Sequence, residues 1–121
     1  MKRLRVGVCV SSETTADVVV ERTFFEGEEV WLGDDPHSTV PVPNWAGAPL
    51  LLISADGFLH LHEGMRVNMC GPSGVNRVVG TYAELKMQAT PLPIPVLLRT
   101  MTISVRKGLS IFARYLRDDE A

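Results

Sequence analysis

The sequence is poor in features that assign a protein to a class at once. Its 121 residues include only two cysteines, Cys9 and Cys70, which are too few for a disulfide framework and do not form a C-x-x-C pair. No apolar run approaches the roughly 18 residues of a membrane-spanning helix. The apolar segment behind the basic N-terminus ends at Ser11, which is too short for a secretory signal peptide. We therefore expect a cytoplasmic protein with reduced cysteines and no direct insertion into a membrane.

An excess of charge of one sign is also missing. Twelve Lys and Arg residues stand against fourteen Asp and Glu residues, for a formal net charge of −2 at pH 7. Nucleic acid rewards a basic face, so we expect no nucleic-acid partner. Apolar residues make up 45% of the chain and charged residues 21%, which is ordinary globular usage and excludes disorder of the whole chain.

The common sequence motifs of catalysis are missing as well. The chain has no nucleophile elbow, P-loop, H-E-x-x-H helix or EF-hand loop. His60 and His62 would share one face of a strand, as in the H-x-H pair of cupins. However, Arg66 and Val67 stand where a cupin has its Glu, and Arg77 stands where it has its third His. We therefore expect no enzymatic activity, metal or cofactor, with a cupin-like metal-binding barrel as an alternative.

What the chain does contain is an apolar residue at every second position over long stretches. Residues 4–10 and 101–106 alternate in this way, which predicts half-buried strands. Ten glycines and eight prolines predict many turns, among them a hairpin at Asp56-Gly57. The sequence predicts an all-β fold, a two-sheet β-sandwich of about 10–12 short strands. Residues 1–116 would form this one domain, and residues 117–121 an acidic tail or the start of a linker.

Several details of the strands can be predicted from the pattern. Pro41 and Pro43 lack backbone donors, so residues 40–42 should form an edge strand. Residues 94–98 read as one strand. A second strand should place Val18, Val20 and Phe24 on its apolar side.

Two segments are ambiguous between strand and helix. Residues 81–88 begin with Thr81 and Glu84 at capping-box spacing, which is compatible with one or two helical turns. Residues 109–116 have apolar side chains at helical spacing. The second segment is short and follows a turn at Gly108, so we favour a strand there.

The two tryptophans invite different interpretations. Trp31 lies within a predicted strand and is expected in the core. Trp45 lies among the turn residues of 43–49, where it either covers the edge of a sheet or is exposed as an anchor for a partner.

The order of three segments resembles that of a forkhead-associated (FHA) domain: Val30-Trp31-Leu32-Gly33, Thr39-Val40-Pro41-Val42-Pro43 and Asp56-Gly57-Phe58-Leu59-His60-Leu61. Residues 63–67 and 101–116 are similar to FHA-like N-terminal domains of myxobacterial gliding-motility and TonB-type envelope proteins. The resemblance covers most of the chain. It implies a β-sandwich of the kind that binds phosphothreonine peptides, with a signalling or scaffold role in a motility or envelope assembly.

The chain departs from the FHA pattern where phosphate would bind. Gly33-Asp34 stands in place of Gly-Arg, and an aspartate repels a phosphate. Residues 44–49 lack the Ser, Arg or His of the next FHA signature. We therefore expect a non-enzymatic protein-interaction or scaffold module with a degenerate phosphopeptide site. The expected contact residues, on loops 33–38 and 43–49, are Gly33, Asp34, His37, Ser38, Asn44 and Trp45.

Alternative partners remain open. Phosphothreonine binding could be retained through relocated basic residues, Arg66 and Arg77. The partner could also be a second copy of the chain joined through an edge strand, although Pro41 and Pro43 argue against open-ended pairing.

Overall fold

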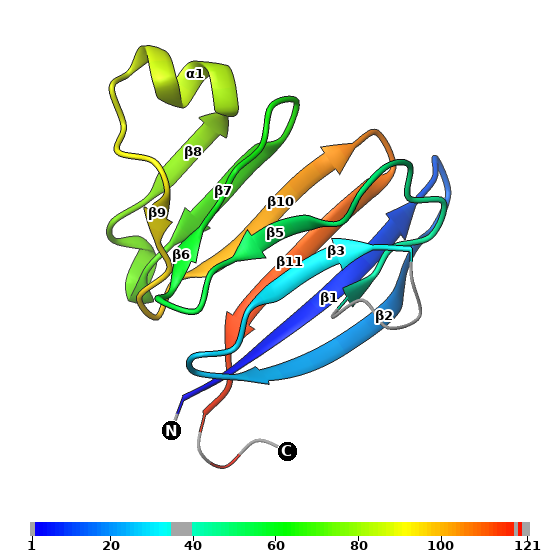
Figure 1. Ribbon diagram of the computed structural model, residues 1–121, viewed down its shortest axis with the longest axis horizontal. Helices are drawn as coiled ribbons and strands as arrows, with labels where there is room; N and C mark the ends of the chain where they lie inside the picture. The colour runs from blue at the N-terminus through cyan, green and yellow to red at the C-terminus, as the bar shows by residue number, and fades with distance from the viewer. Residues whose placement is uncertain (1, 35–39, 118, 120–121) are drawn as a thin grey trace.

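A computed structural model describes residues 2–34, 40–117 and 119. Two sheets pack face to face, one of six strands and one of five (Figure 1). This confirms the predicted all-β sandwich. The acidic tail expected over 117–121 lies largely outside the described residues.

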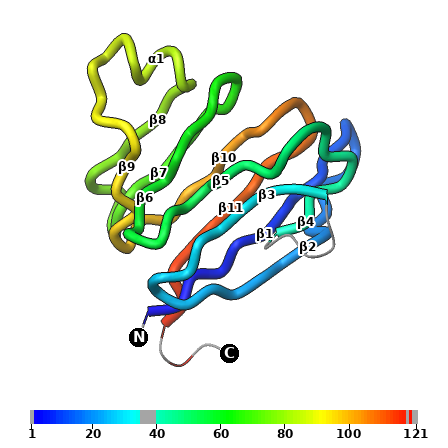
Figure 2. The backbone as a smooth tube through the Cα atoms, viewed as in Figure 1, coloured from blue at the N-terminus to red at the C-terminus, as the bar shows by residue number. Residues whose placement is uncertain are grey.

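The larger sheet is antiparallel throughout and contains the first and last strands of the chain. Its strand order is β2-β1-β11-β10-β7-β8. The strands are β1 (Arg3–Ser11), β2 (Ala16–Phe25), β7 (Arg66–Cys70), β8 (Val78–Thr81), β10 (Thr100–Arg106) and β11 (Leu109–Tyr115). Because β1 pairs antiparallel with β11, the first and last strands bring the two termini to the same end of the sandwich (Figure 2).

The smaller sheet has the order β4-β3-β5-β6-β9. Its strands are β3 (Val30–Gly33), β4 (Val40–Pro41), β5 (Leu50–Ile53), β6 (Phe58–Leu59) and β9 (Ile94–Pro95). The proline-containing strand β4 lies at an edge, as predicted, where a missing backbone donor costs least. The predicted turn at Asp56-Gly57 connects β5 to β6, with Gly57 at a φ of 83°.

Of the two segments that were ambiguous between strand and helix, the first contains a helix and the second is a strand. Thr81 is the N-cap of helix α1 (Tyr82–Met87). The Thr81 hydroxyl accepts a hydrogen bond from the Glu84 amide, and the Glu84 carboxylate accepts one from the Thr81 amide. Residues 109–115 form strand β11, as favoured. A short 3-10 turn, Pro72–Gly74, separates β7 from β8.

The core lies between the sheets and is made of alternate side chains on the facing strands. Its fully buried members come from both layers and include Val6, Val8, Ile103 and Ile111 from the larger sheet, and Leu32, Leu52 and Leu59 from the smaller one. Full burial of such a side chain stabilises the fold by about 1.5–3 kcal/mol. The packed core holds the loops at the two ends of the sandwich apart from each other.

The prediction that Val18 lies on the apolar side of β2 is wrong. Val20 lies opposite Val8, but Val18 lies opposite Cys9, so the register shifts by one residue. The extra residue, Val19, is a bulge that turns the preceding side chains to the other face. Val18 is consequently 53% exposed instead of facing the core with Val20.

The prediction that Trp31 belongs to the core is also wrong. Its neighbours Val30 and Leu32 are buried, and strand alternation turns the indole to the outer face of the smaller sheet. There it is half-buried, and its N–H donates to the Glu29 carboxylate at 3.4 Å.

Candidate functional site

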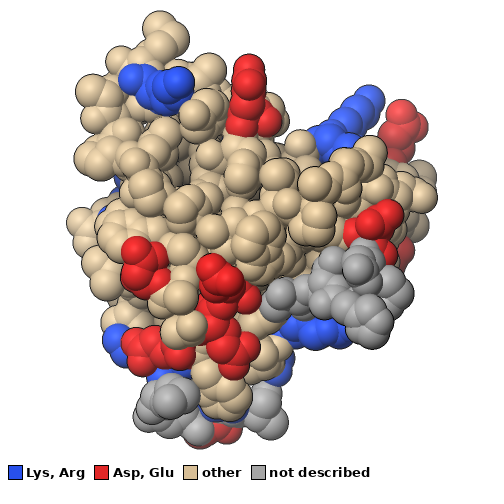
Figure 3. Space-filling model, viewed as in Figure 1, with Lys and Arg blue, Asp and Glu red and all other residues tan. Residues whose placement is uncertain are grey.

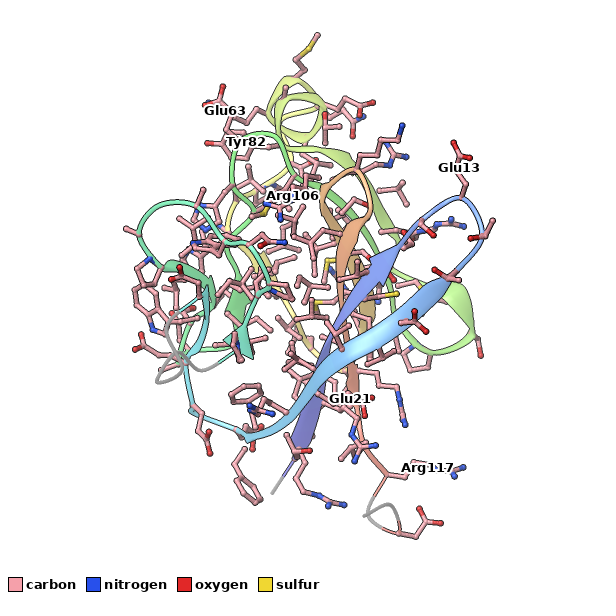
Figure 4. The ribbon with its side chains drawn as sticks, turned by 90° about the vertical axis from the view of Figure 1, so that its right-hand side faces the viewer. Glu13, Glu21, Glu63, Tyr82, Arg106 and Arg117 are labelled. Atoms are coloured by element: carbon pink, nitrogen blue, oxygen red, sulfur yellow. The ribbon has the colours of Figure 1, made fainter. Side chains whose placement is uncertain are left out.

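The described residues of the loops that were predicted to bind a partner, 33–34 and 43–49, lie at the end of the sandwich farther from the termini. The β10–β11 turn and the β1–β2 hairpin meet there, since the Ser11 amide donates to the Gly108 carbonyl at 2.8 Å. The Arg106 Nη2 reaches across to the other sheet and donates to the carbonyls of Pro43 at 3.3 Å and Asn44 at 3.5 Å. Figure 4 looks onto this end, with Arg106 and Glu13 labelled.

The described residues that were predicted to stand in place of an FHA phosphate site lie at the end of β3 and in the loop that follows β4. Gly33 is buried, and its carbonyl accepts from the Val42 amide. Asp34 is exposed, and Asn44 is exposed with a left-handed φ of 57°. The other two predicted contact residues of this loop, His37 and Ser38, lie outside the described residues.

The side chain of Trp45 lies partly inside the sandwich. It is half-buried and packs against the core. Its indole N–H, the only hydrogen-bonding group of the side chain, donates to the Ala48 carbonyl at 3.1 Å. The indole therefore stabilises its own loop by joining Trp45 to Ala48.

The alternative phosphate contacts are not brought together. Arg66 lies opposite Thr81 at one end of the β7–β8 pair, and Arg77 precedes β8 at the other end. At about 3.3 Å per residue, four residues of strand separate their backbones by roughly 13 Å. Arg66 also pairs with the Glu84 carboxylate at 3.5 Å.

Of the two histidines, His62 contacts the smaller sheet through its side chain and His60 through its backbone amide, which donates to the Leu52 carbonyl at 2.7 Å. The Nε2 of His62 lies 2.8 Å from the Leu51 carbonyl oxygen. Among the described residues, no three His, Cys, Asp or Glu side chains gather in a way that could hold a metal ion.

A cavity of about 180 Å³ opens at the opposite end of the sandwich, close to both termini. We call it the end cavity. Three segments that are distant in the sequence surround it: residues 24–28, residues 53–57 and the pair Leu97-Leu98. Leu4, Val30 and Ile53, which line it, belong to the core, so the cavity leads from solvent to the apolar interior.

Two consecutive leucines at the mouth of the cavity have unusual backbone conformations. Leu97 and Leu98 have φ values of 30° and 59°, a region that costs a residue with a side chain roughly 1–2 kcal/mol. The turn is held by the Arg99 amide, which donates to the Val96 carbonyl at 2.9 Å, and by the Val96 amide, which donates to Gly57 at 3.0 Å. This backbone leaves Leu97 73% exposed and Leu98 46% exposed.

Acidic groups line the same mouth and form what we call the acidic rim: Glu26, Glu28 and Asp56. In Figure 3, acidic groups gather on the lower left of the viewed face, at the end where the termini lie. Hydrogen bonds fix the turns that carry them. The Glu26 amide donates to the Lys2 carbonyl at 3.1 Å, and the Glu28 amide to the Phe25 carbonyl at 3.1 Å. The Ser54 hydroxyl donates to the Asp56 carboxylate.

Tyr115 supplies a hydroxyl to the wall of the cavity. Burial raises the pKa of this phenol above its ordinary value, and the negative charge of Glu26 adds to the increase, whereas a hydrogen bond from the Leu98 backbone opposes it. The hydroxyl is therefore neutral at physiological pH and can both donate and accept.

Sequence reasoning missed this end of the molecule. The prediction of one strand over 94–98 is wrong, because β9 ends at Pro95 and the chain then turns. The prolines at 93 and 95 were a usable signal, since proline interrupts a ladder of backbone hydrogen bonds.

Comparison with protein-family models, with curated proteins and with solved structures found no match to this chain. The resemblance to FHA domains therefore stays a prediction. Within the described part of the chain, no helix has the length and apolar character needed to cross a membrane.

Proposed function

We propose that this chain is a non-enzymatic protein-interaction module that takes an apolar side chain of a partner protein into the end cavity. The observation that carries the proposal is the exposed pair Leu97-Leu98 in left-handed backbone at the mouth of an apolar cavity. Strained backbone tends to persist at functional sites, where the surrounding structure overcomes its cost. Clustered exposed apolar residues also mark interaction surfaces.

The size of the cavity supports an anchor of one side chain. Its volume of about 180 Å³ is close to that of an apolar cavity of ~150 Å³ that holds benzene. One leucine or phenylalanine side chain would therefore fill it. Phe25, which is 48% exposed beside the two leucines, extends the apolar contact surface beyond the cavity.

The loops predicted from the FHA resemblance give weaker support for a docking site. The indole of Trp45 packs inward and its donor is used by Ala48. Asp34 places an anion beside the loop where the family captures phosphate, which supports a function independent of phosphorylation. A role in motility or envelope assembly rests on the resemblance alone and stays a prediction.

A selection from a random peptide library displayed on phage tests this proposal. The test variant is Leu97→Asn/Leu98→Asn, because asparagine tolerates left-handed backbone and removes the apolar surface. The control is Met87→Asn, which removes an apolar side chain that is 88% exposed on α1.

We expect the wild type and Met87→Asn to select the same peptides with a central Leu or Phe. The double variant should bind these peptides at least about tenfold more weakly, a loss of about 1.4 kcal/mol. Equal binding by the double variant, or no selected peptide, would contradict the proposal, provided that the circular dichroism spectrum of the variant matches the wild type.

A further inference from the structure

We infer that the partner segment bound by the end cavity is cationic: its Leu or Phe anchor is flanked by Lys or Arg. The inference rests on the proposed function and adds the charge of the ligand. It follows from the side chains that surround the opening.

The charges lining the cavity are unbalanced. Among the described residues that line the cavity, the charged ones are the three carboxylates of the acidic rim and one cation, Lys2. A partner that brings its own cations to this opening gains attraction, whereas an acidic or phosphorylated partner meets repulsion. The acidic rim therefore favours a positively charged ligand, while the apolar interior of the end cavity binds the Leu or Phe anchor.

The rim is held in place before a ligand arrives. Its carboxylates come from two separate turns, residues 25–28 and 54–57, and each turn is closed by its own hydrogen bonds. Turns that are already ordered lose little conformational entropy on binding. The exposed ring of Phe25 lies at the same opening and can accept a cation on its face.

Three capped nine-residue peptides provide the test, each with a central Leu and flanked by Lys, by Gln or by Glu. Their binding is measured by fluorescence anisotropy with the intact chain at low salt. The test variant is Glu26→Gln/Glu28→Gln/Asp56→Asn. The replacements keep the shape of each side chain, and an Asn at 56 can still accept from the Ser54 hydroxyl.

The matched control removes the same charge elsewhere. Glu13→Gln/Asp17→Asn/Glu21→Gln neutralises three carboxylates on β2 and the β1–β2 hairpin, none of which lines the cavity. Both triple variants have the same net charge. Any difference between them therefore reports the position of the carboxylates.

We expect the Lys-flanked peptide to bind the wild type and the matched control about tenfold more tightly than the Gln-flanked peptide, with the Glu-flanked peptide weakest. This preference should vanish in the rim variant and shrink as salt rises from about 0.05 M to about 0.5 M. Equal binding of the Lys- and Gln-flanked peptides to the wild type, with both lost in Leu97→Asn/Leu98→Asn, would overturn the inference and leave the proposed function standing. If none of the peptides binds the wild type, both the inference and the proposed function are contradicted.

Discussion

At the scale of single residues, Tyr115 links the end cavity to the stability of the fold. Its ring lines the cavity, and its hydroxyl receives a hydrogen bond from the Leu98 backbone. Burial favours the neutral phenol over the charged phenolate. The native state therefore keeps the Tyr115 proton to a higher pH than the unfolded chain does.

This difference makes stability fall in alkali. Above the ordinary tyrosine pKa of about 10, the unfolded chain has lost the phenol proton while the native state still holds it, so the free energy of unfolding decreases as pH rises toward the folded pKa. Urea unfolding from about pH 8 to about pH 11 measures the effect. Tyr115→Phe should show a smaller alkaline loss than the wild type, and Tyr82→Phe serves as the matched control. Identical pH profiles for Tyr115→Phe and wild type would contradict this account.

At the scale of elements, α1 is stabilised by hydrogen bonds between residues that are close in the sequence. The helix has only six residues, too few to be stable alone, and depends on its capping box and on the buried side chain of Leu85. The hydrogen bond from the Thr81 amide, followed by the Thr81 hydroxyl contact, lowers the pKa of Glu84, and Arg66 adds to this. The ionised Glu84 carboxylate therefore stabilises the fold at pH values above its ordinary pKa, and this stabilisation is lost as the pH falls through the lowered pKa of the folded state.

Removing the cap hydroxyl tests the capping box. Thr81→Ala should lower the free energy of unfolding by about 1 kcal/mol, because the Glu84 amide loses its acceptor. Thr81→Ser keeps the hydroxyl and should stay close to the wild type. Urea denaturation at neutral pH provides the measurement, and equal losses in both variants would show that the methyl group of Thr81 matters instead.

Elements governed by local rules could be predicted, and those governed by distant contacts could not. The prolines of β4 and the turn at Asp56-Gly57 act through their own backbone chemistry, and the capping-box spacing at Thr81 and Glu84 indicated helical turns as one of two interpretations of residues 81–88. Pro93 and Pro95 signal the end of the preceding strand, but no local signal marks the left-handed backbone at Leu97-Leu98, because these apolar residues extend the pattern of that strand. Tertiary contacts with Gly57 and Tyr115 hold this turn instead.

At the scale of the whole molecule, the sandwich separates two loop clusters of different character. The end with Trp45 is braced by Arg106 and by the indole hydrogen bond. The end near the termini has the cavity, the exposed leucines and the acidic rim. Periodicity could predict two sheets, but it could not predict that residues 24–28, 53–57 and 97–98 meet, because that meeting depends on how the sheets stack.

The most direct test of binding at the end cavity is a titration of isotope-labelled protein with the Lys-flanked leucine peptide, followed by amide chemical shifts in NMR spectra. The account predicts that the perturbed amides cluster at residues 25–28, 54–57 and 97–98, while those of residues 43–49 stay unchanged. Shifts concentrated at residues 43–49 around Trp45, or no saturable shifts at all, would contradict it.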